Sequence, residues 1–412
     1  MTVTVRSFAK INLGLRIGAP RADGFHDLLT VYQTIGLHDL IRVSVERGAG
    51  IEIRCEDPRV PRDSSNTCYR IVERAMAALR AKSRVIIHID KRLPVQGGLG
   101  GASANAVATL LALERALRKS LSPVERLRIA AEVGSDLPLF LLGGTVLGVG
   151  RGEQVYPLSD FPLVACVVVT PEIGVSTPKA FAEWDRRLGL KPLSSSGFDA
   201  GLKARSSTAA SEESMARDET SSAAALKRGS STSTPSALMT SDETLALLRS
   251  AGTDECVRPH TTLRPHTTGD QESRANQGDH TKLTTSTPSD RMNELGCGLS
   301  AWLSEMYSGA PFRRGRAENP LLALDRAGIE NDFEQVVFPE YPELGEAKRA
   351  LVRAGAKYAS LSGSGSTLYG LFASRNAAAS AVKKLRKAGW AAQATVTLTR
   401  AAYWRQIFKT KT

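Results

Sequence analysis

Apolar and polar residues alternate along the first 17 residues of the chain, which is the pattern of a strand with two unlike faces. Over residues 3–17 the apolar side chains fall on one face, with the alternation broken only at Ser7 and Phe8. Lys10 and Asn12 fall on the other face, two positions apart. Residues i and i+2 of a strand point the same way, so this pattern predicts that Lys10 and Asn12 are neighbours.

Other segments predict a mixture of strands and helices. Strands are predicted at 85–90 (VIIHID) and 164–170 (VACVVVT). A helix is predicted to begin after Ser122, because a serine followed by proline is a favourable helix start, and to end at Gly134. A second amphipathic helix is predicted over 342–354. Strands and helices that do not alternate regularly favour an α+β fold.

The composition of the chain changes sharply near Leu193. Residues 201–290 contain 30 Ser or Thr among 90 residues, and no aromatic residue lies between Phe198 and Trp302. Such a segment has too little apolar surface to offset the entropy lost on ordering, so we predict a long disordered insertion at about 193–295. Roughly 310 residues remain, a length suited to two domains.

The excess of positive charge belongs to the part of the chain outside this insertion. The whole chain carries 54 basic and 42 acidic residues, a net of +12, whereas residues 201–290 carry 10 and 12, which leaves +14 for the rest. A basic balance indicates a nucleic acid, a membrane surface or an anionic small molecule. No basic run is interleaved with aromatic residues, which make up 6% of the chain, so nucleic acid is disfavoured.

The sequence also indicates the compartment. No apolar run approaches the roughly 18 residues that a membrane-spanning helix needs, and the first residues lack the core of a signal peptide. The five cysteines are widely spaced, without a CxxC pair, so neither a disulfide framework nor a zinc module is expected. These features predict a soluble cytoplasmic protein with no membrane partner.

A glycine-rich segment at 94–105 (PVQGGLGGASAN) follows the strand at 85–90 and leads into an apolar helical stripe. Four of the five residues from 97 to 101 are glycines, whose backbone N–H groups can surround an anion at the positive end of the following helix. Ser103 is placed to bind a phosphate oxygen or Mg²⁺. The alternative is a tight turn, but so many glycines favour a phosphate site, although the segment matches neither the Rossmann nor the P-loop template.

Two other segments leave alternatives open. Asp136 precedes the apolar run LPLFLL, where its carboxylate either caps the next helix or meets a cation such as Lys10, which would keep it ionised beside a substrate hydroxyl. The spacing favours neither reading. The hydroxyl-rich run at 362–367 (SGSGST) fits a loop that closes over phosphates and equally a hairpin turn.

Taken in order, these segments resemble the GHMP small-molecule kinases. The resemblance covers about 1–191 and 319–412. It rests on the following segments: 8–13 (FAKINL), 21–26 (RADGFH), 94–105, 134–138 (GSDLP), 331–337 (NDFEQVV) and 361–367 (LSGSGST).

The resemblance implies a two-domain fold. It implies an N-terminal domain over 1–157, of the ribosomal protein S5 domain 2-like type, and a ferredoxin-like C-terminal domain over 158–412 that contains the insertion.

The resemblance also implies a reaction. The segment at 21–26 separates kinases of a cytidine-diphosphate-linked methylerythritol from homoserine and mevalonate kinases. We therefore expect phosphorylation of the 2-hydroxyl of that alcohol, with ATP and Mg²⁺, in the non-mevalonate isoprenoid precursor pathway. Asp136 is expected to act as general base and Lys10 to orient it. The alternatives are a GHMP kinase for another alcohol, a nucleotide-binding module without turnover, and a nucleic-acid-binding protein.

Binding residues follow from the same resemblance. Asn12 is expected to contact the substrate near Asp136, and Phe25 and His26 are expected to hold the cytosine. Thr177 is also expected to bind the substrate, and Phe181 is expected to supply a second aromatic face. No residue is assigned as a metal ligand, and a monomer or homodimer is expected. The residues expected to bind ATP are Pro94, Val95, Gln96, Gly97, Gly98, Leu99, Gly100, Gly101, Ala102, Ser103 and Ala104.

The sequence departs from the family pattern at four positions. The family often has Tyr where Phe25 stands, Gly where Gln96 and Ala102 stand, and Ser where Ala104 stands.

Overall fold

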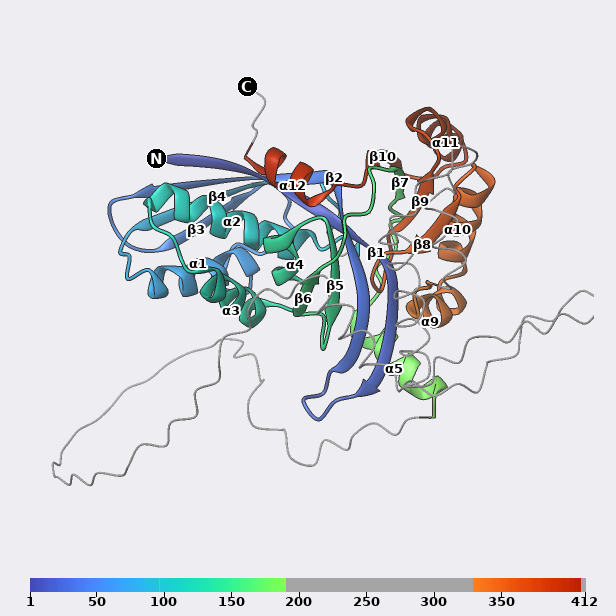
Figure 1. Ribbon diagram of the computed structural model, residues 1–412, viewed down its shortest axis with the longest axis horizontal. Helices are drawn as coiled ribbons and strands as arrows, with labels where there is room; N and C mark the ends of the chain where they lie inside the picture. The colour runs from blue at the N-terminus through green and yellow to red at the C-terminus, as the bar shows by residue number, and fades with distance from the viewer. Residues whose placement is uncertain (96, 190–328, 409–412) are drawn as a thin grey trace, which may run out of the picture.

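A computed structural model describes residues 1–95, 97–189 and 329–408 of the chain. The insertion expected at 193–295 therefore lies outside the described residues, as does Gln96. Two long antiparallel strands, β1 (Thr2–Pro20) and β2 (His26–Glu46), run through the molecule from one sheet to the other (Figure 1). This pair places residues of the N-terminal segment against both halves of the structure.

The first sheet has the strand order β3-β4-β2-β5-β6, and β1 pairs with β2 beside this path. Only β3 and β4 pair in parallel among these strands of the described chain. Its strands and helices are β3 (Ile51–Cys55), α1 (Thr67–Ala78), β4 (Arg84–Asp90), α2 (Gly101–Leu117), α3 (Pro123–Val133), α4 (Leu137–Leu142), β5 (Thr145–Val149) and β6 (Gln154–Pro157). The helices cover this sheet and bury an apolar core against it (Figure 1).

The second sheet is antiparallel, with the order β10-β7-β9-β8. Its strands and helices are β7 (Ala165–Val169), α5 (Thr177–Arg187), α9 (Phe333–Glu340), α10 (Pro342–Arg353), β8 (Tyr358–Leu361), β9 (Leu368–Phe372), α11 (Arg375–Lys387) and β10 (Ala392–Val396). Ile11 and Leu13, on the apolar face of β1, share a core with Cys166 and Leu371 of this sheet. The apolar face of β1 therefore packs on the second sheet at Ile11 and Leu13, whereas Val5 of the same face belongs to the core of the first sheet.

The α+β fold and the predicted elements are confirmed. The strand expected at 85–90 is β4, and the one expected at 164–170 is β7. Ser122 caps α3, where its hydroxyl accepts a hydrogen bond from the Glu125 amide at 3.2 Å. Gly134 ends that helix, as expected.

The last helix, α12 (Arg400–Ile407), returns to the core of the first sheet. The Tyr403 hydroxyl donates to the carbonyl of Phe140, in α4, at 2.7 Å. The domain bounds 1–157 and 158–412 stay a prediction. No helix within the described ranges is long and apolar enough to cross a membrane.

Candidate active site

Lys10 and Asn12 lie side by side on β1, as the alternation predicts. The ammonium of Lys10, which is almost wholly buried, donates to Asn12 Oδ1 at 2.8 Å. The amide of Asn12 donates in turn to the Thr30 hydroxyl on β2 at 2.8 Å. Thr30 thereby fixes which way the Asn12 amide points, and Asn12 fixes the Lys10 ammonium.

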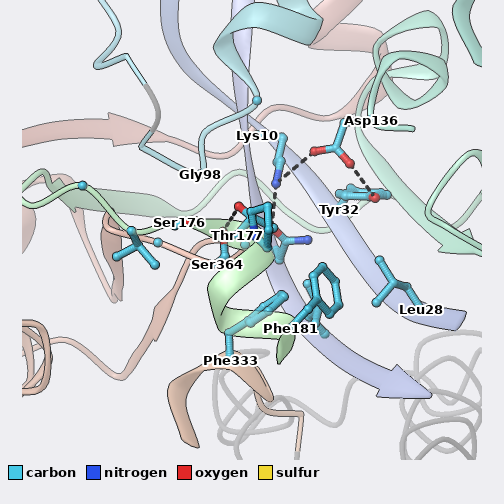
Figure 2. A pocket seen from close by; sticks show the side chains of 18 residues that line it. Lys10, Leu28, Tyr32, Gly98, Asp136, Ser176, Thr177, Phe181, Phe333 and Ser364 are labelled. Atoms are coloured by element: carbon cyan, nitrogen blue, oxygen red, sulfur yellow. Dashed lines mark hydrogen bonds and ion pairs between the residues drawn. The ribbon is translucent and has the colours of Figure 1, made fainter. Parts of the chain in front are cut away.

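Asp136, just before α4, lies next to Lys10. Its Oδ2 lies 3.4 Å from Lys10 Nζ. Asp136 occupies the N-cap position of α4, yet among the described residues its side chain caps no amide of that helix. The structure therefore favours the reading in which the carboxylate meets a cation. Figure 2 shows the pair, with the carboxylate turned toward the ammonium.

Tyr32 contacts this carboxylate and is a residue that the sequence analysis missed. Its hydroxyl donates to Asp136 Oδ1 at 3.0 Å (Figure 2). Burial, followed by the nearby negative charge of Asp136, raises the pKa of the Tyr32 phenol well above its ordinary value, so the phenol remains a donor. The register of the hairpin, which pairs Asn12 with Tyr32, is the signal that would have located it.

Two glycines make room for the Tyr32 side chain. A Cβ on Gly148 would lie 2.4 Å from the Tyr32 ring, and a Cβ on Gly152 would lie 2.4 Å from its hydroxyl oxygen. The Lys10 ammonium also lies over this ring, 5.5 Å from its centroid. Tyr32 is therefore held between backbone and cation, with its hydroxyl aimed at the carboxylate.

These side chains open into a cavity of about 630 Å³ between the two sheets. Residues from both halves of the molecule line it: Lys10, Asn12, Leu15, Leu28, Tyr32, Gly98, Gly100, Asp136, Gly174, Val175, Ser176, Thr177, Pro178, Phe181, Phe333, Gly363, Ser364 and Gly365. At one edge, the hydroxyls of Thr177 and Ser364 hydrogen bond to each other at 2.7 Å (Figure 2). The cavity thus combines one ion pair with apolar and hydroxyl groups.

The glycine-rich segment adopts a backbone that needs glycine. Gly98 has φ +75°, and a Cβ there would lie 2.1 Å from the Ser362 carbonyl oxygen. The hydroxyl of Ser362 donates to the Gly98 carbonyl at 3.0 Å. Gly100, with φ +68°, is the N-cap of α2, so the amides of the helix start lie next to this loop. The combination of loop and helix start fits a phosphate group.

The run at 362–367 is a hairpin turn, one of the two alternatives that the sequence left open, and its closing over phosphates stays a prediction. It is the turn between the paired strands β8 and β9. It also packs on the glycine loop, where the amide of Thr367 donates to the Gly97 carbonyl at 3.2 Å. Gly363 and Ser364 line the cavity that contains Lys10.

A second cavity, of about 370 Å³, lies against the glycine loop. Gly98 and Gly100 line both cavities, so the loop lies where the two meet. The residues expected to bind ATP that line this second cavity are Pro94, Val95, Gly97, Gly98, Leu99, Gly100, Gly101, Ala102 and Ser103. Ala104 lies in the apolar core, and its amide donates to the Gly100 carbonyl at 2.8 Å.

The residues expected to hold cytosine are only partly brought together. Phe181 stacks on His26, with ring centroids 4.7 Å apart and an angle of 10° between the planes. His26 Nε2 lies 2.7 Å from Asp185 Oδ1. Phe25, in the turn between β1 and β2, is 51% exposed, and the Arg151 guanidinium lies 5.0 Å from its ring centroid. Phe181 therefore faces His26 here, and its pairing with Phe25 stays a prediction.

No cluster of three or more His, Cys, Asp or Glu side chains that could hold a metal ion occurs in the part of the chain that the structure describes.

Comparisons with known proteins identify the fold. The family model described as GHMP kinases N terminal domain matches residues 66–144, and the one described as GHMP kinases C terminal matches residues 312–390. A solved 4-(cytidine 5'-diphospho)-2C-methyl-D-erythritol kinase superposes with a TM-score of 0.56 at 22% identity, covering 96% of this chain and 98% of that one. A homoserine kinase from Cytophaga hutchinsonii superposes with the same TM-score at 16% identity, covering 97% and 95%. The fold is that of the GHMP kinases.

Sequence relatives show to which family within the GHMP kinases the chain belongs. The 4-diphosphocytidyl-2-C-methyl-D-erythritol kinase of Solibacter usitatus is 31% identical over 382 residues, which cover 92% of this chain and 84% of the relative. The kinase of the same name from a Nocardioides species is 42% identical over 208 residues, covering 48% of this chain and 69% of the relative. The chain belongs to the 4-diphosphocytidyl-2-C-methyl-D-erythritol kinase family. The resemblance seen in the sequence motifs is thereby confirmed.

Proposed function

We propose that the protein uses ATP to phosphorylate the 2-hydroxyl of 4-diphosphocytidyl-2-C-methyl-D-erythritol. The observation that carries this proposal is the Lys10–Asp136 pair, which lies in one cavity while the glycine loop joins that cavity to a second one. In this arrangement the first cavity holds the alcohol, and the second holds the nucleotide. The γ-phosphate then lies at the glycine loop, where the two cavities meet.

Asp136 acts as the general base. Its Oδ1 accepts a hydrogen bond from Tyr32, which leaves Oδ2 for the substrate hydroxyl and for Lys10. The ammonium of Lys10, held by Asn12, keeps the carboxylate oriented and offsets the charge that develops on the attacking oxygen. The carboxylate receives the hydroxyl proton as the oxygen attacks the γ-phosphorus, and the bond from that phosphorus to the β–γ bridging oxygen breaks, so that ADP leaves.

Phosphoryl transfer depends mainly on positioning and on charge neutralisation. The amides of the glycine loop and of the start of α2 would surround the phosphates, and the space at Gly98 admits no Cβ. Ser103, which lines the nucleotide cavity in the first turn of α2, would hold the Mg²⁺ that is bound with ATP, and this ion would neutralise phosphate charge. These residues support ATP and Mg²⁺ as the cofactors.

The cytosine binds at His26 and Phe181 in this proposal. When the Nε2–H of His26 donates to Asp185, its Nδ1 is left as an acceptor, which suits the exocyclic amino group of cytosine. The flat face of Phe181 provides a stacking surface. Phe25 lies close in sequence and supplies the second aromatic face.

Separate turnover assays with three alcohols test this assignment against other GHMP kinases. We expect ADP release with 4-diphosphocytidyl-2-C-methyl-D-erythritol, and none above background with homoserine or mevalonate. Turnover only with homoserine or mevalonate would contradict the substrate assignment while retaining a kinase. A small molecule as the partner, no nucleic-acid partner, and a monomer or homodimer remain predictions of the sequence.

A further inference from the structure

Asp39, in β2, is a wholly buried carboxylate that the proposed reaction does not use. Four donors saturate it. The Lys91 ammonium and the Asn105 amide donate to its Oδ2 at 2.8 and 2.9 Å. The backbone amides of Arg92 and Leu93 both donate to its Oδ1 at 2.7 Å.

Two of these four donors belong to the walls of the nucleotide cavity, and the other two come from the backbone that leads into the glycine-rich segment. Lys91 and Asn105 line that cavity directly. The amides of Arg92 and Leu93 immediately precede the glycine-rich segment. Asp39 itself is not part of the lining, so it contacts the groups around the cavity from behind.

Lys91 also lies next to the glycine loop. A Cβ on Gly101 would be 3.4 Å from Lys91 Nζ, and the Lys91 side chain is 9% exposed. A lysine side chain has several rotatable bonds and adopts many conformations unless it is held. The ion pair with Asp39 selects one of these conformations and keeps the ammonium beside the first residue of α2.

We propose that Asp39 is a positioning residue for the nucleotide, acting through Lys91 and through the backbone at 92–93. This inference rests on the proposed function, because it takes the second cavity to be the ATP site. Asp39 touches neither substrate in this scheme. Its removal therefore weakens nucleotide binding and leaves recognition of the alcohol unchanged.

The test is a titration with ATP alone, which gives a dissociation constant whether or not the alcohol has been identified correctly. Hydrogen bonds to charged groups correspond to roughly tenfold to a hundredfold in affinity. We expect Asp39→Asn to raise the ATP dissociation constant by about tenfold or more. Lys91→Met should raise it by a similar factor, and the double variant should be little worse than either single variant, because both remove the same interaction.

Glu114→Gln provides the matched control. Glu114, at the other end of α2, is also a buried carboxylate that accepts from a backbone amide, that of Leu121, and pairs with Arg126. Its substitution should lower the melting temperature and leave the ATP dissociation constant within twofold of wild type.

Two results would overturn the proposal. In the first, Asp39→Asn binds ATP within twofold of wild type and differs from it only by a lower melting temperature, as Glu114→Gln does. The other is a double variant whose loss is the product of the single losses. If Asp39→Asn gives no folded protein, the ATP affinity of Lys91→Met is the test. An unchanged affinity overturns the proposal, and an affinity about tenfold lower supports it. The Michaelis constant for the alcohol should stay within twofold in every folded variant.

Discussion

Replacing Tyr32 by phenylalanine removes only the hydroxyl that donates to Asp136, because the ring still fills its space and still lies beneath the Lys10 ammonium. A hydrogen bond to a charged group contributes about 1.5–3 kcal/mol. The Asp136 side chain is 33% exposed, so water can replace the lost donor and the lower end of that range applies. A loss of about 1.4 kcal/mol corresponds to a tenfold lower kcat.

The assay is steady-state ADP release with each substrate varied in turn. We expect kcat of Tyr32→Phe to fall about tenfold while the Michaelis constant for ATP changes less than twofold. Tyr403→Phe serves as the control, because it also removes a buried hydroxyl, one that donates to the Phe140 carbonyl at 2.7 Å away from the ion pair. It should lower the melting temperature and leave kcat unchanged. Wild-type kcat in Tyr32→Phe would refute the role given to this hydroxyl.

Asp136→Asn should lower kcat by about a thousandfold with ATP binding retained in a direct titration, and near-normal turnover would remove Asp136 as the base. Gly98→Ala should abolish ATP binding or folding, because its Cβ would meet the Ser362 carbonyl, whereas Gly50→Ala, also at positive φ but in open space, should cost only about 1–2 kcal/mol in urea unfolding. Burial raises the pKa of the Cys68 thiol to about 12 and raises the pKa of the Tyr32 phenol. The folded state therefore retains protons that the unfolded chain releases. The free energy of unfolding should be highest below about pH 8.5 and should fall as the pH rises further. A constant free energy of unfolding up to about pH 10.5 would contradict this prediction.

The sequence predicted those parts of the site that depend on local pattern. Alternation along β1 predicts that Lys10 and Asn12 are neighbours, and in the structure Lys10 Nζ lies 2.8 Å from Asn12 Oδ1. The glycine-rich segment was located because a strand, a run of glycines and a helix follow one another within a short stretch of chain. The start and end of α3 were readable because Ser122 and Gly134 act within a single turn.

The remaining features depend on contacts between distant segments. Whether Asp136 caps α4 or meets Lys10 depends on how the α3–α4 turn packs against β1, which spacing does not determine. Tyr32 reaches Asp136 only through the β1–β2 register and the space left by Gly148 and Gly152. The stacking of Phe181 on His26 depends in the same way on α5 packing beside β2.

Proton-coupled phosphorus NMR of the product shows directly which oxygen of the substrate receives the phosphate. Carbon 2 of a 2-C-methyl-erythritol bears no hydrogen, so a phosphate on its oxygen has no three-bond coupling to any proton. We expect wild-type protein, ATP, Mg²⁺ and 4-diphosphocytidyl-2-C-methyl-D-erythritol to give a new uncoupled phosphomonoester singlet beside ADP. A phosphomonoester signal split by neighbouring protons, or ADP without a new phosphomonoester, would contradict it.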